Sequence, residues 1–210
     1  MIADGESEED KAWVRIATPL APADLAAFCQ DAERLLRINS LYEFEAWREQ
    51  AGGYVMRARN LSNGCTIETR LRVARRADGV LISYGEGLKT ATAFSVEAPR
   101  EDEVVRFKSC RSVLVVTDDY SGTPEAERRA RHHEIDASLV QWGRDLHRYL
   151  RHWARWSRFP SWRWYMRRVW QPMRPVARRV TFALLVIAAF ELAATLAVAV
   201  LFALGVLHVA

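Results

Sequence analysis

Cysteine is scarce in this sequence, and its spacing excludes two classes of small protein. The three cysteines, Cys29, Cys65 and Cys110, lie far apart, are odd in number and form no C-x-x-C pair. A disulfide framework needs paired cysteines and a zinc site needs ligands at short spacings, so neither is expected. The three thiols are predicted to be reduced and to be mostly small buried side chains.

The usual signatures of catalysis and metal binding are also missing. The sequence has no H-E-x-x-H motif, no glycine-rich loop that could cradle a phosphate, and no arrangement typical of a Ser/His/Asp nucleophile. His132 and His133 are adjacent, and neighbouring side chains on a helix point about 100° apart, which does not suit a shared ligand site. They are interpreted as solvated or packed side chains. No catalytic residue, metal site or cofactor is therefore predicted.

One pair of carboxylates leaves a choice open. Asp118 and Asp119 stand where a strand is predicted to end, directly before Tyr120, Ser121 and Gly122. A carboxylate at the mouth of a cavity can act as a general acid or base when burial raises its pKa. Turn formation and entry into the next helix explain the same residues more simply. We prefer the turn interpretation and keep the acid–base interpretation as an alternative.

Charge is almost absent from the last part of the chain. Residues 180–210 carry one formal charge, at Glu191. About 20 apolar residues suffice to cross a bilayer, and a core helix of a soluble protein rarely stays apolar on all faces for so long. Residues 180–210 are therefore predicted to form a single transmembrane helix. The opening run MIADGESEEDK is neither basic nor apolar, so no secretory signal is expected and residues 1–10 are predicted to be an acidic disordered segment.

Basic charge is concentrated directly before this hydrophobic run. Residues 159–179 interleave arginine with tryptophan, a composition typical of the lipid headgroup region, and residues 161–170 are predicted to form a short helix on the membrane. Nucleic acid is not an expected partner, because the block adjoins the hydrophobic run. Positive residues stay in the cytoplasm, so the N-terminal domain is predicted to face the cytoplasm and the C-terminus to lie across the inner membrane. The residues expected at the interface are Trp153, Trp156, Trp162, Arg163, Trp164, Arg167, Arg168, Trp170, Arg174, Arg178 and Arg179.

Glu191 has two interpretations that the sequence does not separate. A carboxylate inside a bilayer costs a few kcal/mol and usually finds a partner or a proton. Glu191 is either a neutral side chain near one end of an overlong span or a contact with another membrane protein or a proton path.

The region before the arginine-rich block, residues 11–158, has strand periodicity between two helical parts. Residues 11–18 predict a strand and residues 22–39 two short helices. Apolar residues then alternate with charged ones, so that Tyr42, Phe44 and Ala46 share one face. The further predicted strands are 41–47, 53–61, 64–73, 79–87, 90–98 and 112–120, which together form an antiparallel sheet with one apolar face.

A long helix starting near Pro124 is predicted to cover that face. Its apolar stripe runs in steps of three and four residues. The first half is expected to pack on the sheet and the second half to run on toward the membrane. The stripe consists of Ile135, Leu139, Trp142, Leu146, Tyr149, Trp153 and Trp156.

This order of elements resembles the START-like, or polyketide cyclase/dehydratase-like (SRPBCC), superfamily. The resemblance covers about residues 11–155 and lies in PADLAAFCQDAERLLRIN, in LYEFEAW and GYVMRARNL, and in VTDDYSG before the long helix. It implies an α+β helix-grip fold, in which a curved antiparallel sheet of about seven strands wraps a long helix and encloses a hydrophobic cavity. Members bind lipids, sterols, quinones, polyketides or plant hormones, and some catalyse cyclisation or dehydration. The hydrophobic tail departs from the usual pattern.

Alternation places eight candidate cavity residues on the inward face of the predicted sheet. They are Tyr42, Phe44, Tyr54, Met56, Ile67, Leu71, Tyr84 and Phe94. The predicted function is a membrane-anchored, non-catalytic carrier or presenter of a hydrophobic or lipid-like small molecule. One alternative is a tethered cyclase or dehydratase, which would need a polar group such as Asp118 or His132 facing Tyr84. Another is an interaction subunit that docks a membrane complex through Glu191.

Overall fold

The computed structural model describes residues 10–130 and 132–204, without the side chains of residue 129 and residues 132–137. The chain divides into two compact units, Met1–Pro172 and Met173–Ala210, and each is described by itself. Nearly all of the predicted disordered segment 1–10 lies outside the described residues. So do the end of the predicted transmembrane run and the side chains of His132 and His133.

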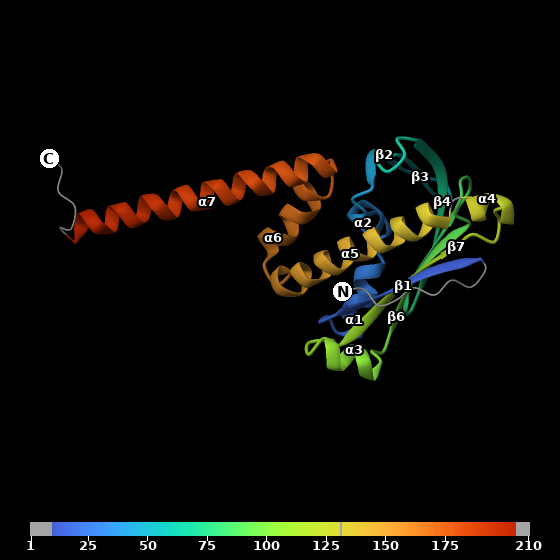
Figure 1. Cartoon of the computed structure of the whole chain (residues 1–210), viewed down its shortest axis with the longest axis horizontal. Helices are drawn as coiled ribbons and strands as arrows, with labels where there is room; N and C mark the ends of the chain where they lie inside the picture. Colours follow the sequence, from blue (N-terminus) through green and yellow to red (C-terminus); the bar gives the residue numbers. More distant parts are fainter. Residues whose placement is uncertain (1–9, 131, 205–210) are drawn as a thin grey trace. The chain divides into compact units, whose positions relative to one another are not determined.

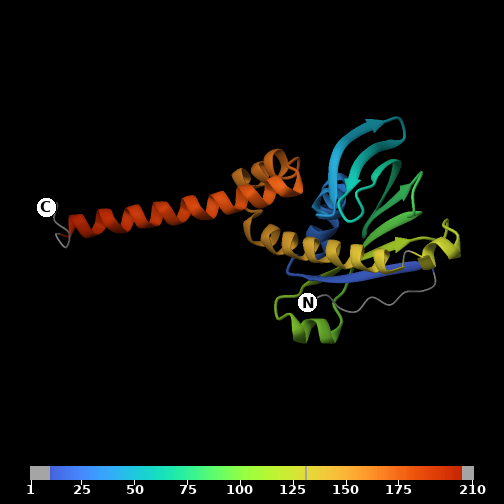
Figure 2. The same ribbon diagram turned by 45° about the horizontal axis from the view of Figure 1, so that its top comes forward.

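The first unit is built on one seven-stranded sheet, which confirms the predicted α+β fold class (Figure 1). Every pair of neighbouring strands is antiparallel, and Figure 2 shows the sheet strongly curved. In spatial order the strands are β1 (Lys11–Thr18), β7 (Ser112–Asp119), β6 (Ala91–Glu97), β5 (Gly79–Tyr84), β4 (Thr66–Arg76), β3 (Gly53–Asn60) and β2 (Tyr42–Gln50).

The register of the strands forms one continuous inward face. Leu71 on β4 lies opposite both Tyr54 on β3 and Tyr84 on β5, so the three side chains share that face. The prediction for Ala46 was wrong. A register shift after Phe44 leaves Glu45 outside the backbone pairing, although its carboxylate pairs with Arg57 on β3, and Trp47 lies opposite Met56. A bulge adds one residue to a strand and reverses the alternation beyond it, so Trp47 replaces Ala46 on the inward face.

The predicted helices pack on this face. α1 (Pro22–Cys29) and α2 (Ala32–Ile38) follow β1, and the Asp31 side chain caps α2 by accepting from the backbone N–H of Arg34 at 3.1 Å. After α4 (Glu125–Ala130), the long helix α5 (His132–Trp156) packs against β1 and α2. The predicted apolar stripe of α5 is buried at Leu139, Trp142, Leu146 and Tyr149.

One helix was not predicted. α3 (Glu101–Arg106) is too short to show a helical period, and an ion cluster attaches it to the sheet. Arg15 on β1 is 6% exposed and donates from Nε to Glu103 Oε1 at 2.9 Å, and it also pairs with Glu97. The charges of Arg15, Glu97 and Glu103 therefore form one paired cluster, with Arg15 and Glu103 buried. These ion pairs explain how the polar helix α3 packs on the outer face of the sheet.

The second unit is a single long helix. α7 (Pro175–Ala203) has 29 residues, or about 44 Å, against a hydrocarbon core of about 30 Å. The helix begins at Pro175 and not near Val180, since proline fits the first turn of a helix. Arg178 and Arg179 therefore lie inside α7. In the described part of the chain it is the one helix long and apolar enough to cross a membrane.

The cysteines differ in their surroundings. Cys29 is fully buried in α1, and burial raises its pKa to about 12. Cys110 is partly buried, with its pKa raised chiefly by burial. Cys65 is exposed, in contrast to the prediction of mostly buried thiols, because it precedes β4, which begins only at Thr66. In the described residues all three are free thiols, in agreement with the prediction of reduced cysteines.

The indole of Trp142 fixes α5 in the core. It is 1% exposed, its Nε1 donates to the carbonyl of Leu35 at 3.1 Å, and its ring meets Phe94 edge-on at 5.4 Å between centroids. We expect Trp142→Ala to lower the free energy of unfolding by about 3–5 kcal/mol. Trp156→Ala, at the 39% exposed end of α5, should cost less than about 1 kcal/mol. Urea unfolding of the full chain in nanodiscs, followed by circular dichroism, measures both, and equal losses would contradict this packing.

Candidate functional site: an aromatic groove with a buried polar end

The inward face of the sheet is covered unevenly. The core residues of that face on β1, β5, β6 and β7 are buried, and Val14, Ile82, Phe94 and Val116 are each at most 2% exposed. On β2, β3 and β4, several apolar side chains of the same face remain partly exposed, although they pack against the core: Phe44, Trp47, Tyr54, Ile67 and Val73. α5 and α1 therefore cover one half of the face. We call the partly exposed other half, which holds the pocket described below, the groove.

Four aromatic rings form the floor of this groove. Tyr42 and Phe44 are 6.5 Å apart between ring centroids, Phe44 and Trp47 are 6.4 Å apart, and Trp47 and Tyr54 are 5.1 Å apart. We call these four residues the aromatic row. Spacings of this size are those of interacting rings, so the row is a largely apolar surface. Its polar atoms are the tyrosine hydroxyls and the indole N–H of Trp47, and the Arg37 guanidinium lies 4.9 Å from the centre of the Phe44 ring.

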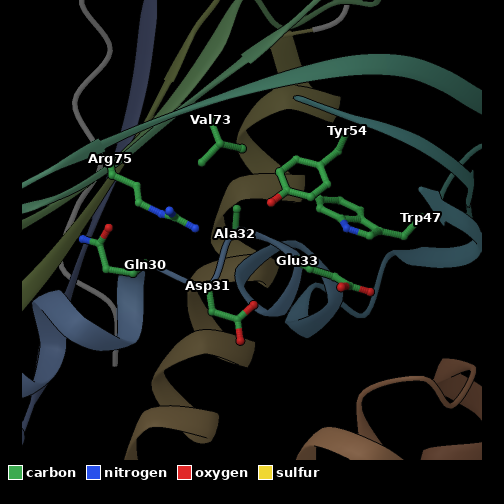
Figure 3. Close-up of a pocket in the computed structure, with 8 residues that line it drawn as sticks. All are labelled: Gln30, Asp31, Ala32, Glu33, Trp47, Tyr54, Val73 and Arg75. Carbon is green, nitrogen blue, oxygen red and sulfur yellow. The ribbon is translucent and has the colours of Figure 1, made fainter. Parts of the chain in front are cut away.

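A pocket of about 230 Å³ lies at the Trp47 end of the aromatic row (Figure 3). Figure 3 shows Val73, Tyr54 and Trp47 projecting from the strands toward Ala32 at the start of α2. Charged and polar groups form the rest of its lining: Gln30, Asp31, Glu33 and Arg75. Ligand pockets usually measure about 300–1,000 Å³, so this pocket fits one ring or a short chain segment of a larger molecule.

A buried polar network is attached to the same face. Asp118 on β7 is 0% exposed and pairs with the ammonium of Lys89, which comes from the loop between β5 and β6 and is 15% exposed. The Asp118 carboxylate also accepts from the hydroxyls of Thr92 at 2.5 Å and Tyr120 at 3.3 Å. The Tyr84 hydroxyl lies 3.1 Å from that of Thr92. We call these five residues the polar network.

The Lys89 ammonium stays charged at neutral pH. Burial alone would lower the pKa of Lys89, but the Asp118 carboxylate and the nearby Tyr120, Tyr42 and Tyr84 hold it well above its ordinary value. Burial also raises the pKa of Tyr84 and of Tyr120, so both are neutral phenols. The Lys89 ammonium additionally lies 5.2 Å from the centre of the Trp142 ring, a cation–π distance.

The structure gives Asp118 and Asp119, whose roles the sequence left open, two different surroundings. Asp119 makes the expected turn contact, accepting from the backbone N–H of Ser121 at 2.8 Å. The turn interpretation was wrong for Asp118, which is buried on the inward face near Tyr84. Alternation along β7 contains this signal, since Asp118 is in phase with Leu114 and Val116. Lys89 was missed because GLKT reads as an ordinary surface loop.

The eight predicted cavity residues all lie on this side of the sheet, but in two environments. Met56, Leu71 and Phe94 are at most 3% exposed and form part of the core. The others are partly exposed at the groove: Tyr42, Phe44, Tyr54, Ile67 and Tyr84. The position of each side chain relative to α5 separates the two sets, and the sequence does not contain that information.

The tryptophans predicted for the membrane interface also fall into two groups, one packed on α5 and one exposed. α6 (Pro160–Tyr165) and the π-helix η1 (Met166–Trp170) belong to the first unit and fold back on α5. Trp162 packs on Trp153 at 5.6 Å, and Trp170 packs on Tyr149 at 5.3 Å. Trp164 is 62% exposed, and the arginines are exposed at positions 163, 167, 168, 174 and 179 and partly exposed at 178.

Comparison with known proteins identifies only distant structural neighbours. No protein-family model and no curated protein matches the sequence. The polyketide cyclase-like protein Cgl2372 from Corynebacterium glutamicum is 17% identical with a TM-score of 0.36, over 68% of this chain and 94% of that one. Ara h 8.0201 is 14% identical with a TM-score of 0.33, over 63% and 94% of the two chains. At this similarity the fold assignment depends on the strand order and α5 themselves.

The polar network should respond asymmetrically to substitution. Asp118→Ala leaves the mostly buried Lys89 ammonium without its counter-charge, which should cost about 3–5 kcal/mol of unfolding free energy. The double change Lys89→Met with Asp118→Leu removes both charges and should cost distinctly less. Urea unfolding of the full chain in nanodiscs compares the variants. A double variant less stable than Asp118→Ala would contradict the charge pairing.

Proposed function

We propose that the first unit binds a hydrophobic small molecule in its groove and that α7 tethers it to a membrane, as a carrier or presenter without catalysis. The observation that supports this is the aromatic row, whose rings remain accessible although they face the interior of the fold. An apolar surface in a concave place lowers the free energy of a molecule that would otherwise remain in lipid.

The enzyme alternative has one observation in its favour, the polar network beside Tyr84. However, the Asp118 carboxylate pairs with the Lys89 ammonium and accepts from the hydroxyls of Thr92 and Tyr120. A general base must come within hydrogen-bond reach of the proton that it takes, and these protein contacts already occupy the carboxylate. The network is therefore better suited to holding a ligand than to transferring a proton, and binding is the preferred function.

The interaction-subunit alternative has less support. Glu191 is exposed on the surface of α7, and the Thr195 hydroxyl donates to the backbone carbonyl of Glu191 at 2.8 Å. This is an ordinary helix contact and does not indicate a partner.

Truncation of aromatic side chains distinguishes groove from core. Phe94→Ala should lower the unfolding free energy by about 3–5 kcal/mol, because Phe94 is buried against Trp142. Phe44→Ala and Tyr54→Ala should cost less stability and reduce the amount of bound apolar molecule instead. Thermal unfolding with and without extracted membrane lipid, together with mass spectrometry of bound molecules, measures both effects. If all three variants lose the same stability and lipid never shifts the midpoint, the proposal fails.

Cys65 offers a test of orientation. The arginines before α7 favour a cytoplasmic position for the first unit. With this orientation, a membrane-impermeant maleimide should label exposed Cys65 in inverted vesicles and not in intact cells. Buried Cys29 should stay unlabelled in both until the chain is unfolded, which makes it an internal control. Labelling of Cys65 in intact cells would contradict the orientation.

A further inference from the structure

The polar network has hydrogen-bonding capacity that its own members do not use. Thr92 has one hydroxyl proton, which lies on the 2.5 Å contact to Asp118, so the Tyr84 hydroxyl donates to Thr92. The Tyr84 oxygen therefore keeps its lone pairs as acceptors. Lys89 has three N–H donors, and within the described part of the chain Asp118 is the acceptor that they contact.

The network lies next to the aromatic row. Tyr84 joins the two: it is partly exposed on the same face, and Leu71 lies opposite both Tyr84 and Tyr54 in the strand register. Hydrogen bonds then connect Tyr84 through Thr92 and Asp118 to Lys89. A molecule that lies on the aromatic row and extends past Leu71 therefore brings its polar group to Tyr84 and Lys89.

The charge balance of the network selects among polar groups. Lys89 and Asp118 cancel each other, and Asp118 is fully buried. A ligand carboxylate would add an unpaired negative charge to this neutral, poorly hydrated place, which is unfavourable. A hydroxyl adds no charge, can accept from the ammonium, and can donate to the Tyr84 oxygen.

We infer that the polar network is a head-group site for the neutral hydroxyl of an otherwise apolar ligand, held by Lys89 as donor and Tyr84 as acceptor. This inference rests on the proposed function, since it assigns the ligand class of the same groove. It makes Asp118 the residue that determines selectivity against acids: it cancels the charge of Lys89 and so removes the attraction for an anion.

Three probes of equal ring size test the inference: 2-naphthol, 2-naphthoate and naphthalene. Binding to the full chain in phosphatidylcholine nanodiscs is measured by calorimetry, with empty nanodiscs subtracted. The wild type should bind 2-naphthol about tenfold more tightly than the other two, as one or two hydrogen bonds to a charged network predict. Lys89→Met should bind 2-naphthol and naphthalene equally.

Asp118→Asn gives the sharper result. It leaves the Lys89 ammonium without a counter-charge, so the preference should reverse and 2-naphthoate should bind about tenfold more tightly than 2-naphthol. A merely structural role of Asp118 would weaken all probes alike and not exchange their order. If Asp118→Asn does not fold, the binding of 2-naphthol and naphthalene to Lys89→Met decides whether the head-group site exists.

The outcomes separate two failures. If the wild type binds all three probes with the same affinity and Lys89→Met does not differ from it, the head-group site is wrong while the groove remains. If no probe binds to the wild type beyond the empty nanodisc, the proposed function is wrong, and the head-group site with it.

Discussion

The indole of Trp142 is the contact that joins the other parts of the first unit. One side chain on α5 donates to the carbonyl of Leu35 in α2, meets Phe94 on β6 edge-on, and lies below the ammonium of Lys89. These contacts hold α5 against the β1 side of the sheet. They also set the boundary of the groove, because the helix that seals one half of the inward face leaves the other half accessible.

The distribution of burial follows from this placement. Side chains under α5 and α2 interdigitate as an ordinary core, while the aromatic row on β2 and β3 has the composition of a core but keeps exposed surface. Burial of apolar side chains normally lowers the free energy, so the accessible row of rings inside the curved sheet is the surface that we propose for ligand binding. The polar network adjoins the same face of the sheet through Tyr84.

Much of this fold can be predicted from the sequence because its strands alternate clearly. The charged outer face of β4, with Glu68, Arg70 and Arg72, fixes the inward positions of Ile67, Thr69 and Leu71. Local irregularities could not be predicted. The bulge after Phe44 depends on pairing with β3, and α3 depends on ion pairs between residues far apart in the chain, such as Arg15 and Glu103.

Prediction of the candidate site from the sequence is limited in the same way. Aromatic residues on β2 and β3 could be assigned to the inward face, but their division between core and groove depends on where α5 lies. Lys89 becomes notable only when the fold brings its loop to Asp118, 29 residues further along the chain. Burial, and not residue type, distinguishes this lysine from a surface lysine.

The central claim is that the groove holds an apolar molecule, and the most direct measurement is mass spectrometry of small molecules that co-purify with the detergent-extracted full chain. The account predicts one apolar compound class, enriched far above its share of the membrane and close to one molecule per chain. Recovery of only bulk phospholipid in the proportions of the surrounding membrane would contradict it.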